Sequence, residues 1–353
     1  METERIVLDR EAEGNFDFGN AISIIRDGGL VAFPTETVYG LGGDATNPEA
    51  SKKIYAAKGR PSDNPLIVHI HAFSQLESIA SEVPEAARKL NDAFWPGPLT
   101  MIVKKNDVIP YETTGGLDTV AVRMPSHPIA KAFLEQSDVM IAAPSANTSG
   151  RPSPTKAEHV LHDLDGKIDC VIDGGSCDIG LESSIIDLST EVPTILRPGY
   201  INKEMFEKVL GKEVIIDPGI LSVNADKGFK PKAPGMKYKH YAPKGDLVVV
   251  EGDVDKVVER INKLAAEAKK AGKKVGVIAT DETKNRYDAD VVVTIGDRHD
   301  EDSIARHLYG VLRDFDDSNV TTIYSESFGT PRIGMAIMNR LLKAAGHQVI
   351  SID

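Results

Sequence analysis

Short apolar runs alternate with helical patterns along residues 1–210, and many Gly and Pro residues interrupt them. A helical pattern over 21–25 ends at Gly28-Gly29, and the next apolar run, 30–33, ends at Pro34. Further strands are expected at 66–70, 99–103, 119–124, 139–142, 169–172 and 184–188, and helices around Ala50, Ala86, Ile129 and Val160. The pattern predicts an α/β domain with a twisted, open sheet and long loops.

The periodicity fades over residues 211–244, where Pro and Gly are frequent, and we interpret this segment as an interdomain linker. Its stretch 237–241, Lys-Tyr-Lys-His-Tyr, is unusual for a passive tether, although such a run can occur by chance. Beyond the linker, strands at 247–250, 275–279, 291–295 and 320–324 alternate with helices around Lys263, Arg306 and Met338. Residues 245–353 are therefore predicted to form a smaller, doubly wound, Rossmann-like domain with a parallel sheet.

The length and net charge of the chain limit the kinds of protein that it can be. A chain of 353 residues predicts two domains, and 41 Lys and Arg against 53 Asp and Glu give a net charge of −12. This charge argues against a general affinity for nucleic-acid backbones or anionic membranes. The N-terminus is not apolar and no run of about 18 apolar residues occurs, so we expect a cytoplasmic protein without stable membrane association. Cys170 and Cys177 match no redox or zinc spacing and are expected to be buried thiols.

Several nucleotide and metal motifs are absent or incomplete. No P-loop pattern is present, so ATP would need a different phosphate cradle. Residues 40–45 fit a loose dinucleotide fingerprint, but a Thr-Glu-Thr segment separates them from the preceding strand. The second domain has no glycine fingerprint after its first strand, which makes an NAD-binding module the weakest interpretation. His159 and His162 have no third ligand nearby, so no metal site built from protein side chains is expected.

Polar and basic residues gather in loops, which is typical of binding sites. Residues 34–40 follow a buried strand and carry hydroxyls and a carboxylate that either orient a polar ligand or cap the strand. In residues 58–65, Gly and Pro are expected to fix an extended turn from which Lys58 and Arg60 project to one side. Such a pair suits phosphate oxygens, and a solvated turn is the alternative.

Arg123 ends an apolar strand and is expected to be half-buried at a sheet edge beside a carboxylate. That carboxylate belongs either to a structural Asp or Glu or to a ligand. Small residues in the loop 142–155 would let a ligand approach the backbone closely. The basic side chains predict a cleft that binds a small polyanion and stabilises a transferred phosphoryl group, with Mg²⁺ brought by the nucleotide. They are Lys58, Arg60, Arg123, Arg151 and Arg197.

Three of these segments resemble a known family. Residues 33–42, 58–60 and 144–147 are similar to the K-x-R and S-x-N signature of the YrdC family, in order and in spacing. The run 233–243 and the domain after it resemble the longer, two-domain form of that family. The resemblance implies synthesis of L-threonylcarbamoyladenylate from L-threonine, bicarbonate and ATP, with release of pyrophosphate. A downstream transferase would use this product to form threonylcarbamoyladenosine on tRNA.

The resemblance also implies roles for single residues, with Arg123 holding the threonine carboxylate. The catalytic positions would be Lys58, Arg60, Ser145 and Asn147. The L-threonine site would comprise Thr37, His69, Arg123, Ala143 and Ser183. The ATP site would comprise Lys58, Arg60, Asn64, Thr119, Ser145, Asn147, Ser153, Arg197 and, from the linker, Tyr238. The linker would fold over the active site as a lid that excludes water.

A module that binds tRNA or double-stranded RNA without catalysis is the alternative function, because a basic cleft can also follow a phosphate backbone. The net charge of −12 argues against strong direct nucleic-acid binding. Binding to a backbone weakens steeply with salt, whereas binding of ATP and threonine in a closed pocket changes less.

Overall fold

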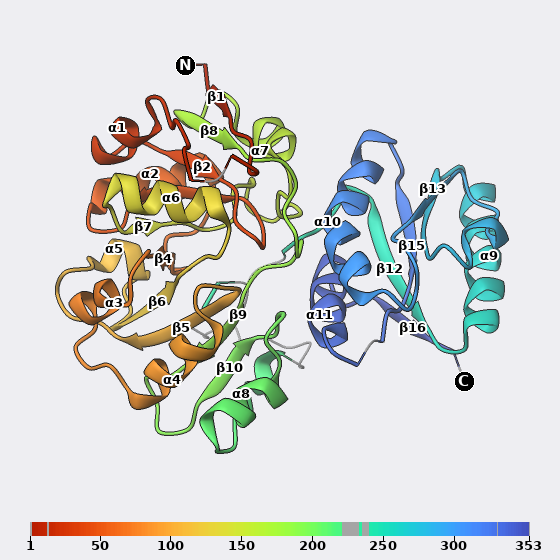
Figure 1. Ribbon diagram of the computed structural model, residues 1–353. Coiled ribbons are helices and arrows are strands. Elements are labelled where there is room, and N and C mark those ends of the chain that lie inside the picture. The colour runs from red at the N-terminus through yellow and green to blue at the C-terminus, as the bar shows by residue number, and fades with distance from the viewer. Residues whose placement is uncertain (1, 13, 221–232, 235–239, 330, 353) are drawn as a thin grey trace. The chain divides into compact units, whose positions relative to one another are not determined.

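The computed structural model describes residues 2–12, 14–220, 233–234, 240–329 and 331–352 (Figure 1). The chain divides into two compact units. The first comprises Met1–Ser149, Ser153–Asp178 and Glu182–Lys237, and the second comprises Gly150–Pro152, Ile179–Leu181 and Tyr238–Asp353. Each unit is an α/β structure, as the sequence predicts.

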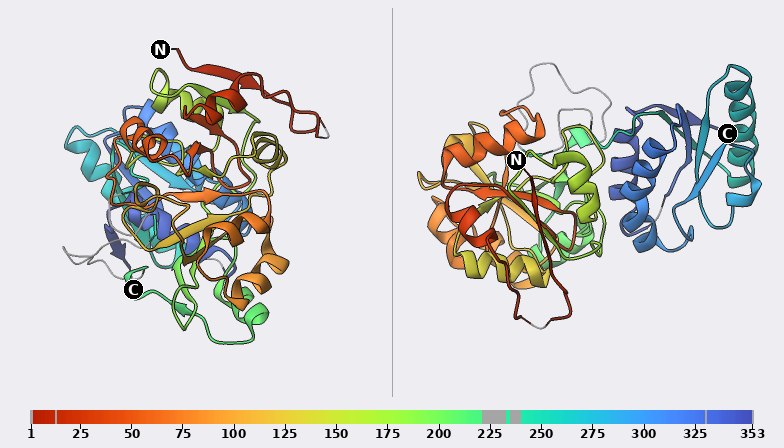
Figure 2. Two further views of the ribbon diagram at one scale, coloured as in Figure 1. Left: turned by 90° about the vertical axis from the view of Figure 1, so that its left-hand side faces the viewer. Right: turned by 90° about the horizontal axis from the view of Figure 1, so that it is seen from above.

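The first unit is built on a mixed sheet of eleven strands in the order β1-β8-β2-β3-β7-β4-β6-β5-β9-β10-β11. The strands are β1 (Glu4–Val7), β2 (Val31–Phe33), β3 (Gly40–Asp44), β4 (Ile67–His69), β5 (Leu99–Lys104), β6 (Thr119–Arg123), β7 (Ile141–Ala142), β8 (Cys170–Asp173), β9 (Ser184–Asp187), β10 (Thr194–Arg197) and β11 (Ile215–Ile216). The helices are α1 (Ala21–Arg26), α2 (Pro48–Lys58), α3 (Phe73–Ile79), α4 (Glu85–Phe94), α5 (Tyr111–Thr114), α6 (Pro128–Ser137), α7 (Ala157–Leu164), α8 (Lys203–Leu210) and the 3₁₀ turn η1 (Pro218–Ile220). Figure 2 shows the strong twist of this sheet, which confirms the predicted open, twisted form.

The glycine-rich segment 40–45 forms a strand over Gly40–Asp44 and not a phosphate-binding turn. Gly40–Asp44 forms β3, which pairs antiparallel with β2 and with β7. A Cβ added at Gly42 would lie 2.7 Å from Ile141 Cγ2, so glycine permits the close approach of two strands here. This agrees with the argument against a dinucleotide fingerprint, because Gly40–Asp44 is a strand and not a turn between a strand and a helix.

The predicted linker overlaps the first unit. Residues 215–216 form β11, which pairs with β10, and the turn η1 follows at 218–220. The first unit therefore extends past the predicted boundary at residue 210. Tyr238 lies outside the described residues.

The second unit is a parallel five-stranded sheet in the order β14-β13-β15-β12-β16. Its strands are β12 (Asp246–Glu251), β13 (Val275–Ala279), β14 (Val291–Thr294), β15 (Thr322–Glu326) and β16 (Val349–Ser351). Its helices are α9 (Val254–Lys270), α10 (Glu301–Asp317), α11 (Gly334–Ala344) and the 3₁₀ turn η2 (Lys284–Arg286). The helix α9 covers one face, and α10 and α11 cover the other (Figures 1 and 2), which confirms the doubly wound prediction.

Both cysteines are free and buried, as expected. Burial raises the pKa of the Cys170 thiol to about 12, and burial also raises the pKa of Cys177. Because only the thiolate reacts, iodoacetamide should leave both thiols unmodified in the native protein and alkylate both in denaturant. Mass measurement of the two samples checks this, and rapid labelling of either thiol in the native protein would contradict it.

Among the described residues, no helix combines the length and the apolar character needed to cross a membrane. No group of three His, Cys, Asp or Glu side chains within that part of the chain is placed to hold a metal ion.

Candidate active site

One face of the central strands of the first unit carries several of the predicted site residues. His69 on β4 and Arg123 on β6 are register neighbours, and Thr100 on β5 lies opposite Arg123. Side chains alternate along a strand, so Thr119 shares this face with Arg123. The intervening Val120 and Val122 point into the main core. We call this side of β4, β6, β5, β9 and β10 the site face.

A hydrogen-bonded group on the site face joins β5, the residue before β9, and β10. The Ser183 and Thr100 hydroxyls lie 2.7 Å apart. The guanidinium of Arg197 donates from Nε to the Ser183 carbonyl at 2.9 Å and from Nη2 to the Ser183 hydroxyl at 3.0 Å. The structure thus brings a predicted threonine-site residue and a predicted ATP-site residue into direct contact.

Arg123 differs from the expectation of a half-buried charge at a sheet edge. The strand β6 lies between β4 and β5, and only 4% of Arg123 is exposed. Its Nη2 lies 2.7 Å from Oε1 of buried Glu36, and its Nη1 donates to the Thr37 hydroxyl at 2.8 Å. The carboxylate beside Arg123 in this structure is therefore structural, supplied by the loop after β2.

The guanidinium of Arg123 still has N–H donors available for a ligand. Among the described residues, its Nε has no hydrogen-bond partner, and its Nη2 has only the ion pair with Glu36. A guanidinium presents five donors in one plane, so a second carboxylate can bind the unused donors. The two alternatives for this arginine, a structural carboxylate and a ligand carboxylate, are thus compatible.

His69 is buried beside Arg123 and is neutral. Its Nδ1 lies 3.1 Å from the Ile67 carbonyl, and its ring packs edge-on against Phe33 at a centroid distance of 6.0 Å. Burial, and then the charge of Arg123, lowers the pKa of His69 to about 3. At neutral pH this side chain therefore offers a neutral polar ring to a ligand.

The neutral state of His69 predicts a pH-dependent stability. In the unfolded chain His69 binds a proton below about pH 6.5, whereas the folded protein excludes that proton until the pH nears the folded pKa of about 3. The stabilising effect is complete above pH 6.5 and is lost as the pH falls, by about 1.4 kcal/mol per unit. Urea unfolding near pH 7 and near pH 5 should give a smaller pH difference for His69→Gln than for the wild type. Equal differences would contradict the assignment.

The K-x-R and S-x-N segments meet in the structure. Lys58 is the last residue of α2, and Gly59 ends the helix with φ 61°. The Lys58 ammonium donates to the backbone carbonyls of Ser145 and Asn147, and the Ser145 hydroxyl donates to Asn147 Oδ1 at 2.6 Å. The predicted extended turn is wrong at this point, because a helix end places the lysine.

Arg60 also contacts backbone carbonyls. Its Nη2 donates to the Asn64 carbonyl at 3.2 Å and to the Pro65 carbonyl at 3.0 Å. Asn64 is buried, and its side-chain Oδ1 has no hydrogen-bond partner among the described residues. These bonds define the conformation of the loop 60–65, and a role of the two cations toward phosphate stays a prediction.

The other predicted residues have defined places. The Ser153 hydroxyl donates to Glu182 Oε1 at 2.6 Å, and both residues are buried. The backbone N–H of Ala143 donates to the Ile67 carbonyl at 2.8 Å. Thr119 begins β6, about 13 Å along the strand from Arg123. Arg151 belongs to the second unit, where its Nη2 lies 2.6 Å from Asp316 Oδ2.

A small apolar cluster forms part of the site face. It comprises Ile67, Ile102, Ala121, Ile185, Leu196 and Ala233. Ala233 comes from the predicted linker and is completely buried. Part of the linker segment therefore packs on the same side of the sheet as His69 and Arg123.

The sequence reasoning gave no role to Thr100, although it contacts Ser183. It treated Glu36 as the carboxylate of the loop 34–40 that orients a ligand or caps the strand, and Glu182 as part of a segment ahead of a strand, but it predicted neither of their partners. Glu36 stands out only as a carboxylate in a loop of hydroxyl residues, because its partner Arg123 is distant in the chain. Thr100 lies in an apolar strand, and only its alternation with Met101 indicates that it faces the opposite side of the sheet.

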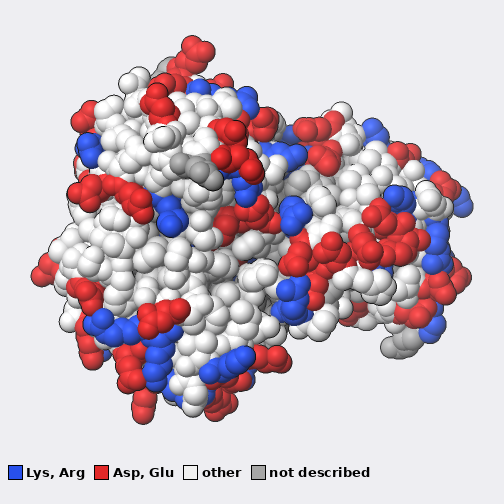
Figure 3. All heavy atoms as spheres, viewed as in Figure 1, with Lys and Arg blue, Asp and Glu red and all other residues white. Residues whose placement is uncertain are grey.

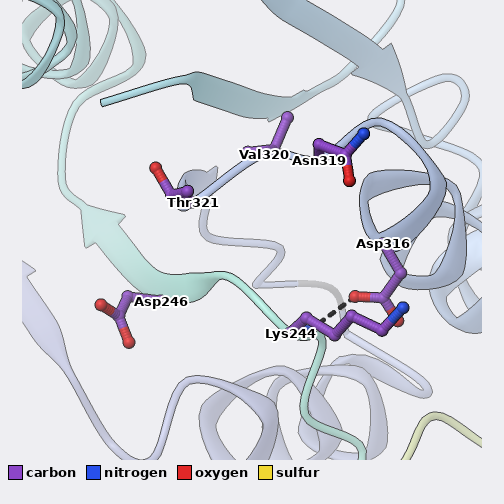
Figure 4. A pocket seen from close by; sticks show the side chains of 6 residues that line it. All are labelled: Lys244, Asp246, Asp316, Asn319, Val320 and Thr321. Carbon is purple, nitrogen blue, oxygen red and sulfur yellow. Dashed lines mark hydrogen bonds between the residues drawn. The ribbon is translucent and has the colours of Figure 1, made fainter. Parts of the chain in front are cut away.

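The second unit has a hollow at the amino ends of β12 and β15 (Figure 4). It is lined by Lys244, Asp246, Asp316, Asn319, Val320 and Thr321. The Lys244 N–H donates to Asp316 Oδ1 at 2.6 Å. Doubly wound sheets bind ligands at their carboxyl ends, so this hollow is not at the position typical of the fold.

Comparison with known proteins agrees with this geometry. Residues 23–199 match the Sua5/YciO/YrdC family model, described as "Telomere recombination". Residues 201–346 match the model "Threonylcarbamoyl-AMP synthase, C-terminal domain". The Threonylcarbamoyl-AMP synthase of Pyrococcus abyssi is 52% identical over 332 residues, which cover 94% of this chain and 95% of that protein. The chain belongs to the Sua5/YciO/YrdC family.

Other members of the Sua5/YciO/YrdC family support the same assignment. The Threonylcarbamoyl-AMP synthase of Bacillus subtilis is 49% identical over 98% of this chain and 97% of its own. The crystal structure of P. abyssi Sua5 complexed with L-threonine superposes with a TM-score of 0.91, at 48% identity, and covers 100% of both chains. The predicted family, two-domain α/β fold and adenylyl-transferring enzyme class are confirmed.

Proposed function

We propose that this protein synthesises L-threonylcarbamoyladenylate from L-threonine, bicarbonate and ATP and releases pyrophosphate. The observation that carries the proposal is the joining of Thr37, His69, Arg123 and Ser183, four residues expected to bind threonine, on one face of the sheet. The L-threonine complex of the P. abyssi relative, at 48% identity, supports the same substrate.

Threonine binding would rest mainly on Arg123. Its unused donors would hold the amino-acid carboxylate in a buried environment, where charge-assisted hydrogen bonds are strong. The Thr37 and Ser183 hydroxyls and the neutral His69 ring would supply further polar contacts.

ATP binding would rest on the helix end of α2 and the loop after β7. Lys58 and Arg60 supply positive charge, and Ser145 and Asn147 supply small polar groups beside them. Asn64, Thr119, Ser153 and Arg197 would complete the site. Mg²⁺ would arrive as part of the substrate MgATP, because this ion keeps phosphate and water ligands and needs few from protein.

The reaction would proceed in two bond-forming steps. The threonine amine attacks the carbon of bicarbonate, and water leaves as the N–C bond forms. A carbamate oxygen then attacks the α-phosphorus of ATP, and pyrophosphate leaves with the electrons of the broken P–O bond. The protein would contribute proximity and positive charge at the phosphoryl group, and no covalent enzyme intermediate is required.

The linker would act as a lid over this site. The packing of Ala233 in the apolar cluster of the site face supports this role for the segment. A closed lid would exclude water from a labile carbamate and a mixed anhydride. The labile product would be used by a transferase that modifies tRNA.

Pyrophosphate release by the purified protein tests the proposal. With ATP, Mg²⁺ and bicarbonate, release should require L-threonine. Bound ATP without threonine-dependent release would favour the RNA-binding alternative, whose affinity would fall steeply with salt. On the face drawn in Figure 3, Lys and Arg are interspersed with Asp and Glu.

A further inference from the structure

We propose that Glu36 is the general base that removes a proton from the ammonium group of L-threonine. The inference rests on the proposed function and adds a catalytic residue to it. Free threonine carries an ammonium group at neutral pH, and an ammonium nitrogen has no lone pair with which to attack bicarbonate. Some group must therefore accept a proton before the N–C bond can form.

Glu36 lies where such a base is needed. It stands between Thr35 and Thr37 in the loop after β2, and only 5% of it is exposed. Its Oε1 is 2.7 Å from Arg123 Nη2, so it shares this guanidinium with the expected substrate carboxylate. A threonine carboxylate on the unused donors of Arg123 would bring the α-amino group, one carbon away, toward Glu36.

The Glu36 carboxylate still has acceptor capacity for a ligand. Within the described part of the chain, neither of its oxygens accepts a hydrogen bond, and its Oε1 forms the ion pair with Arg123. A buried carboxylate normally has two or more donors, so this deficit indicates a missing donor. The ammonium group of a substrate is a donor of the right charge.

Substrate binding itself would favour the proton transfer. Two carboxylates at one buried guanidinium repel each other, and a proton taken up by one of them relieves the repulsion. If the threonine carboxylate took the proton, it would lose its charge and with it the ion pair to Arg123 that holds the substrate. Glu36 is therefore the carboxylate that takes the proton.

Among the described residues around it, Glu36 is the candidate for this role. Arg123 on β6 is a permanent cation. His127, at the start of α6, has its pKa lowered to about 4, by burial first. Burial likewise raises the pKa of Cys177, which is therefore a neutral thiol. The further charges Arg10 and Asp178, which act on His127, pair with each other. Glu36 is the carboxylate in this set that pairs with Arg123.

The step balances without any added reactant. One proton moves from the ammonium nitrogen to Glu36, and the amine then attacks the bicarbonate carbon. The amine loses its second proton as the carbamate forms, and the bicarbonate hydroxyl leaves as water after taking up one proton. The second amine proton goes to that departing hydroxyl, and Glu36 releases the first proton to solvent, so the carboxylate is regenerated and one proton is released in each cycle.

The test compares Glu36→Gln with the wild type in single-turnover pyrophosphate release across a pH series. Gln keeps the size and an oxygen acceptor for Arg123, so threonine binding should stay within a few-fold. At neutral pH the rate should fall about 100-fold, the usual contribution of a general base. The rate of the variant should then rise about tenfold per pH unit as free amine accumulates, while the wild-type rate changes little.

Asp173→Asn is the matched control, because Asp173 also pairs with an arginine, Arg5, but on β8 away from the site face. It should leave the rate and its pH dependence unchanged. A Glu36→Gln variant with the wild-type rate, or one slowed equally at every pH, would overturn the proposal. A raised KM for threonine with unchanged kcat would make Glu36 a binding group instead. If the wild type releases no pyrophosphate with threonine, the proposed function fails first.

Discussion

Lys58→Ala should release pyrophosphate at least about 100-fold more slowly than the wild type. The Lys58 ammonium bridges the carbonyls of Ser145 and Asn147, so its loss frees the loop that carries both predicted ATP contacts. Its loss also removes a positive charge from the expected phosphate site. Single-turnover measurements with saturating ATP and threonine would report the effect on the chemical step.

Lys53→Ala provides the control on the same helix. The Lys53 ammonium also donates to a backbone carbonyl, that of Gly28 at 2.7 Å. Its removal therefore measures the effect of losing such a bond away from the expected phosphate site. This variant should keep the wild-type rate within a few-fold. Equal rates of pyrophosphate release for the two variants, or a wild-type rate for Lys58→Ala, would show that Lys58 has no role in the reaction.

Arg123→Met should abolish measurable threonine binding and destabilise the protein by about 3–5 kcal/mol. The first effect follows from the loss of the carboxylate fork, and the second follows because Glu36 would be left as a buried charge without a partner. Calorimetric titration with threonine measures the first effect. Urea unfolding measures the second.

The double variant Arg123→Met with Glu36→Gln separates the two effects. Removing the stranded charge should restore most of the free energy of unfolding, because a buried ion pair contributes little net stability over neutral residues. Threonine binding should not return. Recovery of threonine binding in the double variant would show that Arg123 does not hold the substrate.

The strands could be predicted where apolar runs are long and are ended by polar, Gly or Pro residues. The strands β2, β4, β5 and β6 and the second-unit strands β12 to β15 follow such runs. The strand β3 could not be predicted in this way, because its glycines are poor strand formers and are explained by the close packing of Gly42 on Ile141. The two-residue strand β11 depends on its pairing with β10, a contact that local sequence does not encode.

The candidate site could be predicted in its residue types but not in its pairings. Arg123 reads from the sequence as a charge that needs a carboxylate, and the structure supplies Glu36 from a distant loop. The meeting of Lys58 with Ser145 and Asn147 likewise joins segments far apart in the chain. Side-chain type and strand alternation are local properties, whereas these contacts follow from the order of strands in the sheet.

The most direct measurement uses ¹³C-labelled bicarbonate with ATP, Mg²⁺ and L-threonine, followed by mass analysis of the products. The account predicts one product that contains AMP, threonine and the labelled carbon, formed together with pyrophosphate. Omission of threonine should remove that product. Release of pyrophosphate without the labelled adduct, or an adduct without the label, would contradict threonylcarbamoyladenylate synthesis by this protein.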